Sequence, residues 1–187
     1  DTAAIHMEIK KDSLWEEIPF LFVSDSVLPR KYEILAEWEP EKEYQLSIDS
    51  MAFKGVYGLH TNKVKQTMKV KKLNEYGTIL LNITGADSTA VVELLDGSGK
   101  VLRQQRITPQ NTADFYYLNP GTKFYIRLFN DRNGNGVWDT GKYSEHLQPE
   151  EVYYFPKVWE MKANFDFEEN WNINAVPVEK QKLDEIK

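Results

Sequence analysis

A polar stretch in the second half of the chain carries the strongest local signal for chemistry. Its oxygen-bearing side chains follow the spacing with which a calcium loop uses positions 1, 3, 5 and 9. The candidate ligands are Asp131, Asn133, Asn135, the backbone carbonyl of Val137, and Asp139. Gly136 falls at position 6, where such a loop turns sharply. Because calcium prefers six to eight hard oxygen ligands, this stretch predicts a calcium site.

Two features of the same stretch favour a purely structural turn instead. Position 12 is Lys142, where a calcium loop normally has a glutamate that binds through both oxygens. The Asn-Gly-Asn-Gly run over 133–136 favours tight turns, since both residue types tolerate positive φ angles. In this alternative, Asp131 and Asp139 accept hydrogen bonds from backbone amides. In both alternatives, we expect the four polar side chains to converge on one point and any calcium to bind weakly.

No other part of the sequence supplies a set of catalytic groups. The histidines His6, His60 and His146 are far apart and lack the spacing of a zinc site. The chain has no cysteine, no nucleotide-binding glycine motif and no nucleophile elbow. The carboxylates between Glu37 and Glu43 alternate along a stretch that reads as an exposed face. The sequence therefore predicts a protein that is not an enzyme and has no cofactor other than calcium.

Aromatic side chains are the second candidate for function. Rings could form a platform on which the apolar faces of sugars stack, whereas core and cross-strand packing would use the same residues. The candidate rings are Tyr116, Tyr117, Tyr125, Tyr153, Tyr154 and Phe155. In a consecutive pair on a strand, one ring faces the core and the other faces solvent. Exposed and coplanar rings in a groove would favour sugar binding, and scattered rings would favour packing.

Charge and composition exclude several classes of partner. The net charge of −6 argues against nucleic-acid binding, which needs a basic face, and against docking on an anionic membrane. No apolar run approaches the ~20 residues of a membrane span. A chain of 187 residues can bury a core without disulfides or metal. The partner is therefore expected to be a surface protein or a glycan, and the chain a monomer.

The hydrophobic pattern has a period of two along most of the chain, which predicts strands joined by turns every 8–12 residues. We predict an all-β fold with two antiparallel β-sandwich units, over 1–73 and 74–172, and a charged tail over 173–187 that is a short helix or disordered. The polar stretch 71–75 marks the boundary between the units. Residues 131–151 form a long loop, and its large apolar ring, Trp138, predicts that the loop packs back on the sandwich.

Two groups of motifs resemble known families. The first resembles the last strands of a bacterial Ig-like domain of the type found in S-layer proteins and surface lipoproteins. It comprises Trp38-Glu39-Pro40 and the stretches 44–50 and 53–59. The second resembles a prealbumin-like unit of the collagen-adhesin B type, as found in the same proteins of Gram-negative gut-type bacteria. It comprises the stretches 115–121, 124–127 and 131–141, and Gln148-Pro149-Glu150.

The resemblance implies a non-enzymatic structural or adhesion module at the cell surface. The alternative is a carbohydrate-binding module for polysaccharide capture. The family implies an extracellular or outer-membrane location, with a precursor that carries a signal peptide and a lipid anchor. The first strands of a complete Ig-like domain would precede Asp1, so the segment 1–73 is expected to be an incomplete Ig-like unit that does not fold alone.

Overall fold

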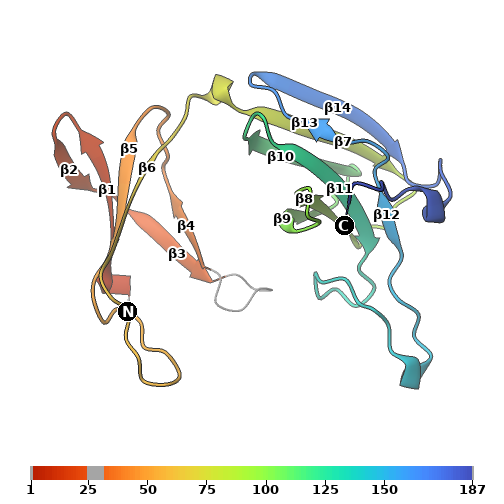
Figure 1. Cartoon of the computed structure of the whole chain (residues 1–187), viewed down its shortest axis with the longest axis horizontal. Helices are drawn as coiled ribbons and strands as arrows, with labels where there is room; N and C mark the ends of the chain where they lie inside the picture. The colour runs from red at the N-terminus through yellow and green to blue at the C-terminus, as the bar shows by residue number, and fades with distance from the viewer. Residues whose placement is uncertain (1, 25–31, 187) are drawn as a thin grey trace. The chain divides into compact units, whose positions relative to one another are not determined.

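The computed structural model describes residues 2–24 and 32–186 of the chain, which form two compact units, Asp1–Lys72 and Leu73–Lys187 (Figure 1). Strands hold 48% of the residues, and no helix in the described ranges reaches seven residues. The prediction of an all-β sandwich-type fold is therefore confirmed. The only helices among these residues are short 3-10 turns, namely η1 (Thr2–Ala4), η2 (Leu73–Glu75), η3 (Tyr143–Glu145) and η4 (Val178–Lys180).

The N-terminal unit is built from a four-stranded sheet and a two-stranded sheet. The larger sheet has the order β2-β1-β5-β6 and is antiparallel throughout, and β3 pairs with β4 in the smaller one. Their bounds are β1 (Ile5–Lys11), β2 (Leu14–Glu17), β3 (Phe20–Ser24), β4 (Tyr32–Ala36), β5 (Glu43–Ile48) and β6 (Val64–Lys69). Ile5, Met7 and Ile9 alternate with polar residues along β1, so one face of this strand is buried.

The core of the N-terminal unit is small. Its fully buried cluster contains Met7, Ile9 and Tyr44, with Phe20 and Ile34 of the smaller sheet packed against it. The Tyr44 hydroxyl accepts a hydrogen bond from the Glu39 backbone N–H at 2.7 Å. It also donates to the Glu37 carbonyl oxygen at 3.3 Å. Tyr44 therefore joins the core to the turn that precedes β5.

The C-terminal unit contains two sheets of larger extent. One has the order β10-β7-β14, and the other has the order β12-β11-β8-β9, with β13 also paired to β11. Their bounds are β7 (Gly77–Thr84), β8 (Ala90–Leu95), β9 (Val101–Arg106), β10 (Thr112–Leu118), β11 (Lys123–Asn130), β12 (Val152–Tyr154), β13 (Trp159–Glu160) and β14 (Phe165–Asn172). The predicted hairpin around Asp96 is confirmed, because β8 and β9 pair in antiparallel register. The Asp96 carboxylate accepts the backbone N–H groups of Ser98 and Lys100.

One strand pair departs from the antiparallel pattern. β14 runs parallel to β7 over eight residue pairs, from Phe165 beside Gly77 to Asn172 beside Thr84 (Figure 1). The first and the last strand of the C-terminal unit therefore lie side by side. A period-two pattern indicates which residues share a face, but it does not indicate the direction of the neighbouring strand.

The residues after β14 also belong to the packed structure. Ile173 joins the main apolar cluster of the C-terminal unit, and Ile186 joins a second cluster with Leu95 and Tyr125. Gln181 is only 2% exposed. The segment 173–187 was expected to be a short helix or disordered. Its described residues contain one short 3-10 helix, and their apolar side chains join two clusters of the core.

Because Gly77 has no side chain, the start of β7 packs closely against the segment that joins β13 to β14. A Cβ atom at this position would lie 2.1 Å from the Met161 sulfur and 2.6 Å from the Lys162 carbonyl oxygen. Gly77→Ala is therefore expected to lower the free energy of unfolding by about 1–3 kcal/mol, as overpacking does. Urea denaturation measures the change. Gly97→Ala is the matched control, because its Cβ would meet nothing closer than 3.9 Å, and equal effects of the two substitutions would contradict this account.

Candidate functional site

The long loop between β11 and β12 begins with a fully buried carboxylate. Asp131 is 0% exposed. Its Oδ1 accepts the backbone N–H groups of Gly134 at 2.8 Å and Asn135 at 3.1 Å. Its Oδ2 accepts the backbone N–H of Gly136 at 2.9 Å. Asp131 therefore accepts hydrogen bonds from three consecutive backbone amides, and the Asn-Gly-Asn-Gly stretch bends around its carboxylate.

A guanidinium from the neighbouring strand completes this arrangement. Arg106, at the end of β9, donates from Nη2 to Asp131 Oδ2 at 2.6 Å and to the Gly134 carbonyl oxygen at 3.0 Å. Burial alone would raise the pKa of Asp131. The Gly136 amide, the Arg106 guanidinium and the Gly134 amide together outweigh burial, so the pKa lies below its ordinary value of 3.8. Asp131 is therefore charged at neutral pH, and both of its oxygens accept hydrogen bonds.

The other polar side chains of the loop meet at Asp139. Its Oδ2 accepts hydrogen bonds from Nδ2 of Asn133 at 2.6 Å and from Nδ2 of Asn135 at 3.0 Å. The two amide oxygens turn away from Asp139, to the backbone N–H groups of Asn135 and Val137 respectively. Three of the four predicted side chains thus converge on one oxygen, while Asp131 binds the backbone. The amides present nitrogen to this point, as hydrogen-bond donors.

The metal prediction for Asp131, Asn133, Asn135, Val137 and Asp139 remains a prediction. Within residues 2–24 and 32–186, no group of three or more His, Asp or Glu side chains is placed to hold a metal ion. The backbone bonds of Asp131 are those of the structural-turn alternative. Among the predicted ligands, both oxygens of Asp131, the amide oxygens of Asn133 and Asn135, and Asp139 Oδ2 already accept hydrogen bonds.

A second buried carboxylate closes the loop, and sequence reasoning did not identify it as such. Glu150 is 4% exposed. Its Oε1 accepts the Arg132 backbone N–H at 2.7 Å, and its Oε2 accepts the Asp139 backbone N–H at 3.1 Å. The Trp138 indole N–H donates to the Glu150 carbonyl oxygen at 2.9 Å. Trp138 thus contacts the returning limb of the loop, and Glu150 ties the outgoing limb to the returning limb. Packing of the loop on the sandwich through Trp138 stays a prediction.

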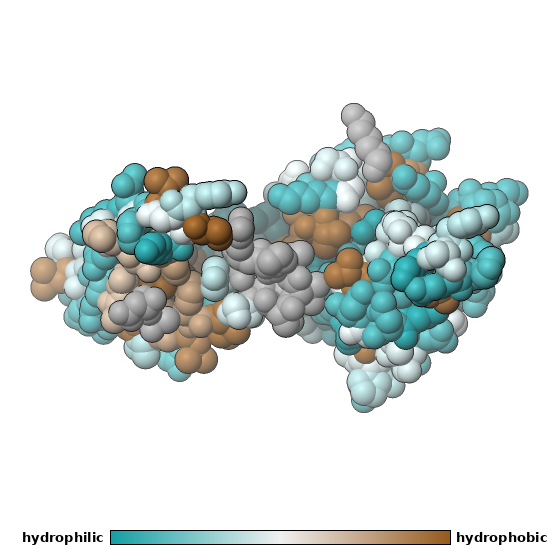
Figure 2. Space-filling model, turned by 90° about the horizontal axis from the view of Figure 1, so that it is seen from below, coloured by the Kyte–Doolittle hydropathy of each residue, from teal (hydrophilic) through white to brown (hydrophobic). Residues whose placement is uncertain are grey.

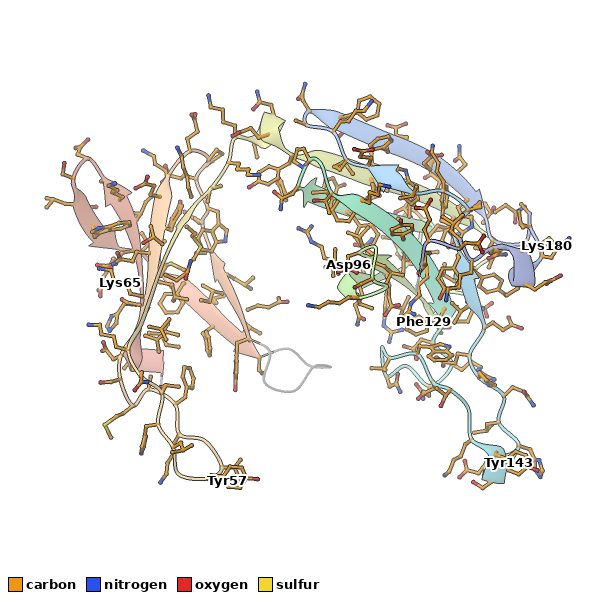
Figure 3. All side chains as sticks on the ribbon, in the orientation of Figure 1. Tyr57, Lys65, Asp96, Phe129, Tyr143 and Lys180 are labelled. Carbon is orange, nitrogen blue, oxygen red and sulfur yellow. The ribbon has the colours of Figure 1, made fainter. Side chains whose placement is uncertain are left out.

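The two limbs of the loop enclose a hollow. The cavity has a volume of about 440 Å³ and is lined by Arg132, Asn133, Asp139, Gly141, Lys142, Leu147, Gln148 and Glu150. Arg132 donates to the Gln148 carbonyl oxygen at 2.5 Å. The tip of the loop carries η3, where Tyr143 is 95% exposed and points away from the unit (Figure 3). Both cations and both carboxylates of the lining belong to the loop itself.

The predicted aromatic rings do not form one platform. Tyr125, Tyr153 and Phe155 are buried, and Tyr154 is half-buried. Tyr116 and Tyr117 are exposed, because the pairing of β10 with β7 shifts register between Phe115 and Leu118. Tyr117 has a φ of 57°, in the left-handed region that non-glycine residues rarely adopt.

The two exposed rings of this bulge do not share a plane. The Tyr116 and Tyr117 rings are tilted by 50° at a centroid distance of 6.3 Å. Tyr76 meets the Tyr117 ring edge-on, at 80°. Arg103 donates to the Tyr116 carbonyl oxygen at 2.5 Å and so holds the bulge in place. Rings tilted in this way are not coplanar, and a flat sugar platform needs coplanar ring faces.

His6 is the one histidine of the described chain with two carboxylate partners. Its ring lies 3.1 Å from Glu17 and 3.4 Å from Asp49, and hydrogen bonds to Glu17 and then Asp49 raise its pKa above 6.5. The interaction of protonated His6 with the two carboxylates stabilises the fold fully below pH 6.5, and this stabilisation is lost as pH rises through the raised pKa of His6. Glu17→Gln is expected to lower the pKa of His6 in a nuclear magnetic resonance titration. Glu16→Gln is the control, since Glu16 pairs with Lys11, and an unchanged pKa in Glu17→Gln would contradict the assignment.

Comparison with known proteins adds no assignment to this geometry. No model of a known protein family matches the chain, and a search of curated proteins finds no match. Over the described ranges, none of the helices has the length and apolar character needed to cross a membrane. The all-β, sheet-rich structure is compatible with an Ig-like or related β-sandwich domain.

Proposed function

We propose that the chain is a non-enzymatic structural or adhesion module. The observation that supports this is how the long loop uses its charged groups. Asp131, Arg106 and Glu150 form hydrogen bonds with the backbone of the loop itself. The charged groups that would be most suited to chemistry therefore stabilise the conformation of the loop. A module that spaces or presents other parts of a protein needs rigid units of this kind.

The location and ancestry of the module are part of the same proposal. We place it at the surface of a Gram-negative bacterium, exported as a lipoprotein precursor, with an Ig-like segment followed by a prealbumin-like unit. The support is the sequence resemblance together with a β-rich architecture in which each of two units has its own apolar cluster. Antibodies against the chain should label intact source cells, and labelling only after permeabilisation would refute this location.

A module exchange separates a spacer from an adhesin. In the full-length parent protein, this chain would be replaced by two unrelated β-sandwich domains of the same combined length. A spacer keeps its surface display and the activity of its neighbours after the exchange. An adhesin loses attachment of the cells to their target. Loss of a chemical activity in the exchanged protein would refute the non-enzymatic proposal.

Carbohydrate binding is the second candidate, favoured by one observation. Tyr116 and Tyr117 are about half exposed on a bulge with a left-handed tyrosine, and strained residues often occur at functional sites. A glycan array tests it with the wild-type chain and with Tyr116→Ala and Tyr117→Ala. Binding that both substitutions abolish would establish this candidate. Because the two rings are tilted by 50°, we expect no such binding.

We further propose that any calcium bound by the loop is bound weakly. Asp131 is saturated by three amides and Arg106, and Lys142 replaces the final glutamate of a calcium loop. A dissociation constant of about 10⁻⁴–10⁻³ M, as in extracellular modules, would stabilise the fold by about 0.4–1.4 kcal/mol at about 1 mM calcium. Thermal melts with chelator and with several millimolar calcium measure this. A shift of many degrees would refute it.

A further inference from the structure

The N-terminal unit carries an ordered hairpin outside its sheets, over residues 51–61, which we call the apolar hairpin. Its limbs are joined by hydrogen bonds from the Met51 amide to the Thr61 carbonyl at 2.8 Å and from the Thr61 amide to the Phe53 carbonyl at 3.0 Å. At the tip, the Gly58 amide donates to the Gly55 carbonyl at 3.0 Å. Gly58 has a φ of 77°, as in a hairpin that closes with a left-handed glycine.

The root of the hairpin is fixed to the smaller sheet by aromatic contacts. The Phe53 ring lies 6.3 Å from the rings of both Phe22 and Tyr32, which themselves stack at 4.9 Å. The Thr61 hydroxyl accepts the Phe53 amide at 3.1 Å. The hairpin is therefore held in one orientation on its unit, and its tip is presented as a rigid feature.

The tip is apolar and almost wholly exposed. Val56, Tyr57 and Leu59 are 87%, 94% and 76% exposed, and Met51 at the root is 66% exposed. Tyr57 points away from the unit in Figure 3, and apolar side chains reach the surface of this unit in Figure 2. Isolated exposed apolar residues are ordinary, but four on one short hairpin form a patch that a partner would cover.

Positive charge predominates close to this patch. Lys54 lies in the hairpin, and Lys63 and Lys65 follow it, whereas the carboxylate nearest in sequence, Asp49, is a partner of His6. Lys54 lies opposite His60, directly behind the tip. Within the described part of the chain, Lys54, Lys63 and Lys65 have no carboxylate within ion-pair distance. The net charge of −6 for the whole chain conceals this local excess of positive charge.

We propose that the apolar hairpin docks the N-terminal unit on the surface of an anionic lipid bilayer. Val56, Tyr57 and Leu59 enter the interface, and Lys54 and Lys63 contact lipid phosphates. Three residue steps separate Lys54 from Tyr57, so the tip extends at most roughly 10 Å, comparable with the ~5–10 Å to which interfacial segments bury their apolar side. Lysine stems can lie along the apolar boundary while their ammonium groups stay at headgroup depth.

An anionic lipid surface would account for both the apolar tip and the lysines at its root, whereas other classes of partner would account for only one of the two. A soluble polyanion would neutralise the lysines but would leave Val56, Tyr57 and Leu59 in water. A hydrophobic pocket of another protein would cover the tip but would not need the lysines at its root, Lys54, Lys63 and Lys65. This inference is independent of the proposed spacer or adhesion role, since either role is compatible with a unit that rests on a bilayer.

Vesicle flotation with the full chain tests the proposal. The chain is mixed with phosphatidylcholine vesicles that contain phosphatidylglycerol and, separately, with vesicles of phosphatidylcholine alone. Strong binding is expected only to the anionic vesicles, and it should weaken as salt is raised. The double variant Val56→Ser with Tyr57→Ser should bind at least about tenfold more weakly. Lys54→Gln and Lys63→Gln should each cost about fivefold.

Tyr143→Ser is the matched control, because Tyr143 is 95% exposed on a loop of the other unit. It should bind like the wild-type chain. Absence of flotation with anionic vesicles overturns the proposal. It is also overturned if the lysine variants lose binding while the Val56 and Tyr57 variant does not, since that result indicates a polyanion site. Equal loss in Tyr143→Ser overturns it as well.

The absence of cysteine from the sequence permits a second measurement. Tyr57→Cys and Tyr143→Cys can each be labelled at one position with an environment-sensitive fluorophore. The label at position 57 should shift to the blue on addition of anionic vesicles, and the label at position 143 should not. A blue shift at position 143 alone, or at neither position, overturns the assignment of the apolar hairpin as the inserted element.

Discussion

Replacement of Asp131 by alanine is expected to lower the free energy of unfolding of the C-terminal unit by about 3–5 kcal/mol. The substitution removes one carboxylate and leaves three backbone amides and the Arg106 guanidinium without their acceptor. Because Asp131 is fully buried, water does not replace it without opening the loop. Urea denaturation of the full chain, followed by the fluorescence of its tryptophans, measures the change.

Asp139→Ala is the matched control for this prediction. Asp139 lies in the same loop and also accepts two hydrogen bonds, but both come from asparagine side chains that can turn to solvent. Its loss should cost about 1 kcal/mol. If the two substitutions cost the same, Asp131 does not organise the loop.

The pH dependence of stability follows from the lowered pKa of Asp131. A lowered folded-state pKa contributes stability above the unfolded value of 3.8, and this contribution is lost as pH falls through the folded pKa. The wild-type chain should therefore lose stability more steeply below that value than Asp131→Ala does. Parallel acid profiles for the two proteins would contradict the account.

The second large effect is expected at Gln181, where the chain folds back after β14. Its Oε1 accepts the Tyr154 amide at 2.9 Å, and its Nε2 donates to the carbonyl oxygens of Ile173 at 2.8 Å and Val176 at 2.7 Å. Gln181→Ala leaves these three backbone groups without a partner and should lower the free energy of unfolding by about 2–4 kcal/mol.

Gln148→Ala is the control for Gln181, because Gln148 is exposed. Its effect should stay within about 0.5 kcal/mol. Hydrogen exchange gives a second readout, since Gln181→Ala should increase the exchange rate of the Tyr154 amide specifically. If that amide stays protected, the side chain of Gln181 is not what holds the segment 173–186 on the core.

The fold class was predictable because periodicity is a local property. The alternation from Ile5 to Ile9 matches the buried face of β1, and the Asp96 turn matches the β8–β9 hairpin. The parallel pairing of β14 with β7 was not predictable, since the paired residues are about ninety positions apart in the sequence. The alternation along each strand also does not indicate which strand lies beside it or in which direction. The residues next to Gln181 in the sequence are charged, and nothing in this local pattern predicts that the Gln181 side chain is buried.

The candidate site was predictable only in part, for the same reason. The spacing of Asp131, Asn133 and Asn135 indicated a turning, oxygen-rich loop, and the structure places a tight turn there. The partners Arg106 and Glu150 come from 25 and 19 positions away, and no spacing rule links them to Asp131. Their charges become informative only when β9 and β12 flank the loop.

The bulge at Tyr116 and Tyr117 shows a different limit. A regular strand would bury one of the two rings, yet both are about half exposed. The register shift between Phe115 and Leu118 adds one residue on β10 only, so the alternation fails there. Consecutive tyrosines give no sign of such a shift, because each fits a strand equally well.

The side-by-side, parallel course of β7 and β14 decides how the C-terminal unit responds to mechanical tension. A force that pulls the two ends of the unit apart first detaches the segment 173–186, and it then acts on the start of β7 and on the end of β14. It drags the two strands along each other, so the bonds across all eight residue pairs are loaded together in shear. Antiparallel terminal strands would instead open from one end, one bond at a time. Single-molecule pulling should therefore find that the C-terminal unit yields at a higher force than the N-terminal unit.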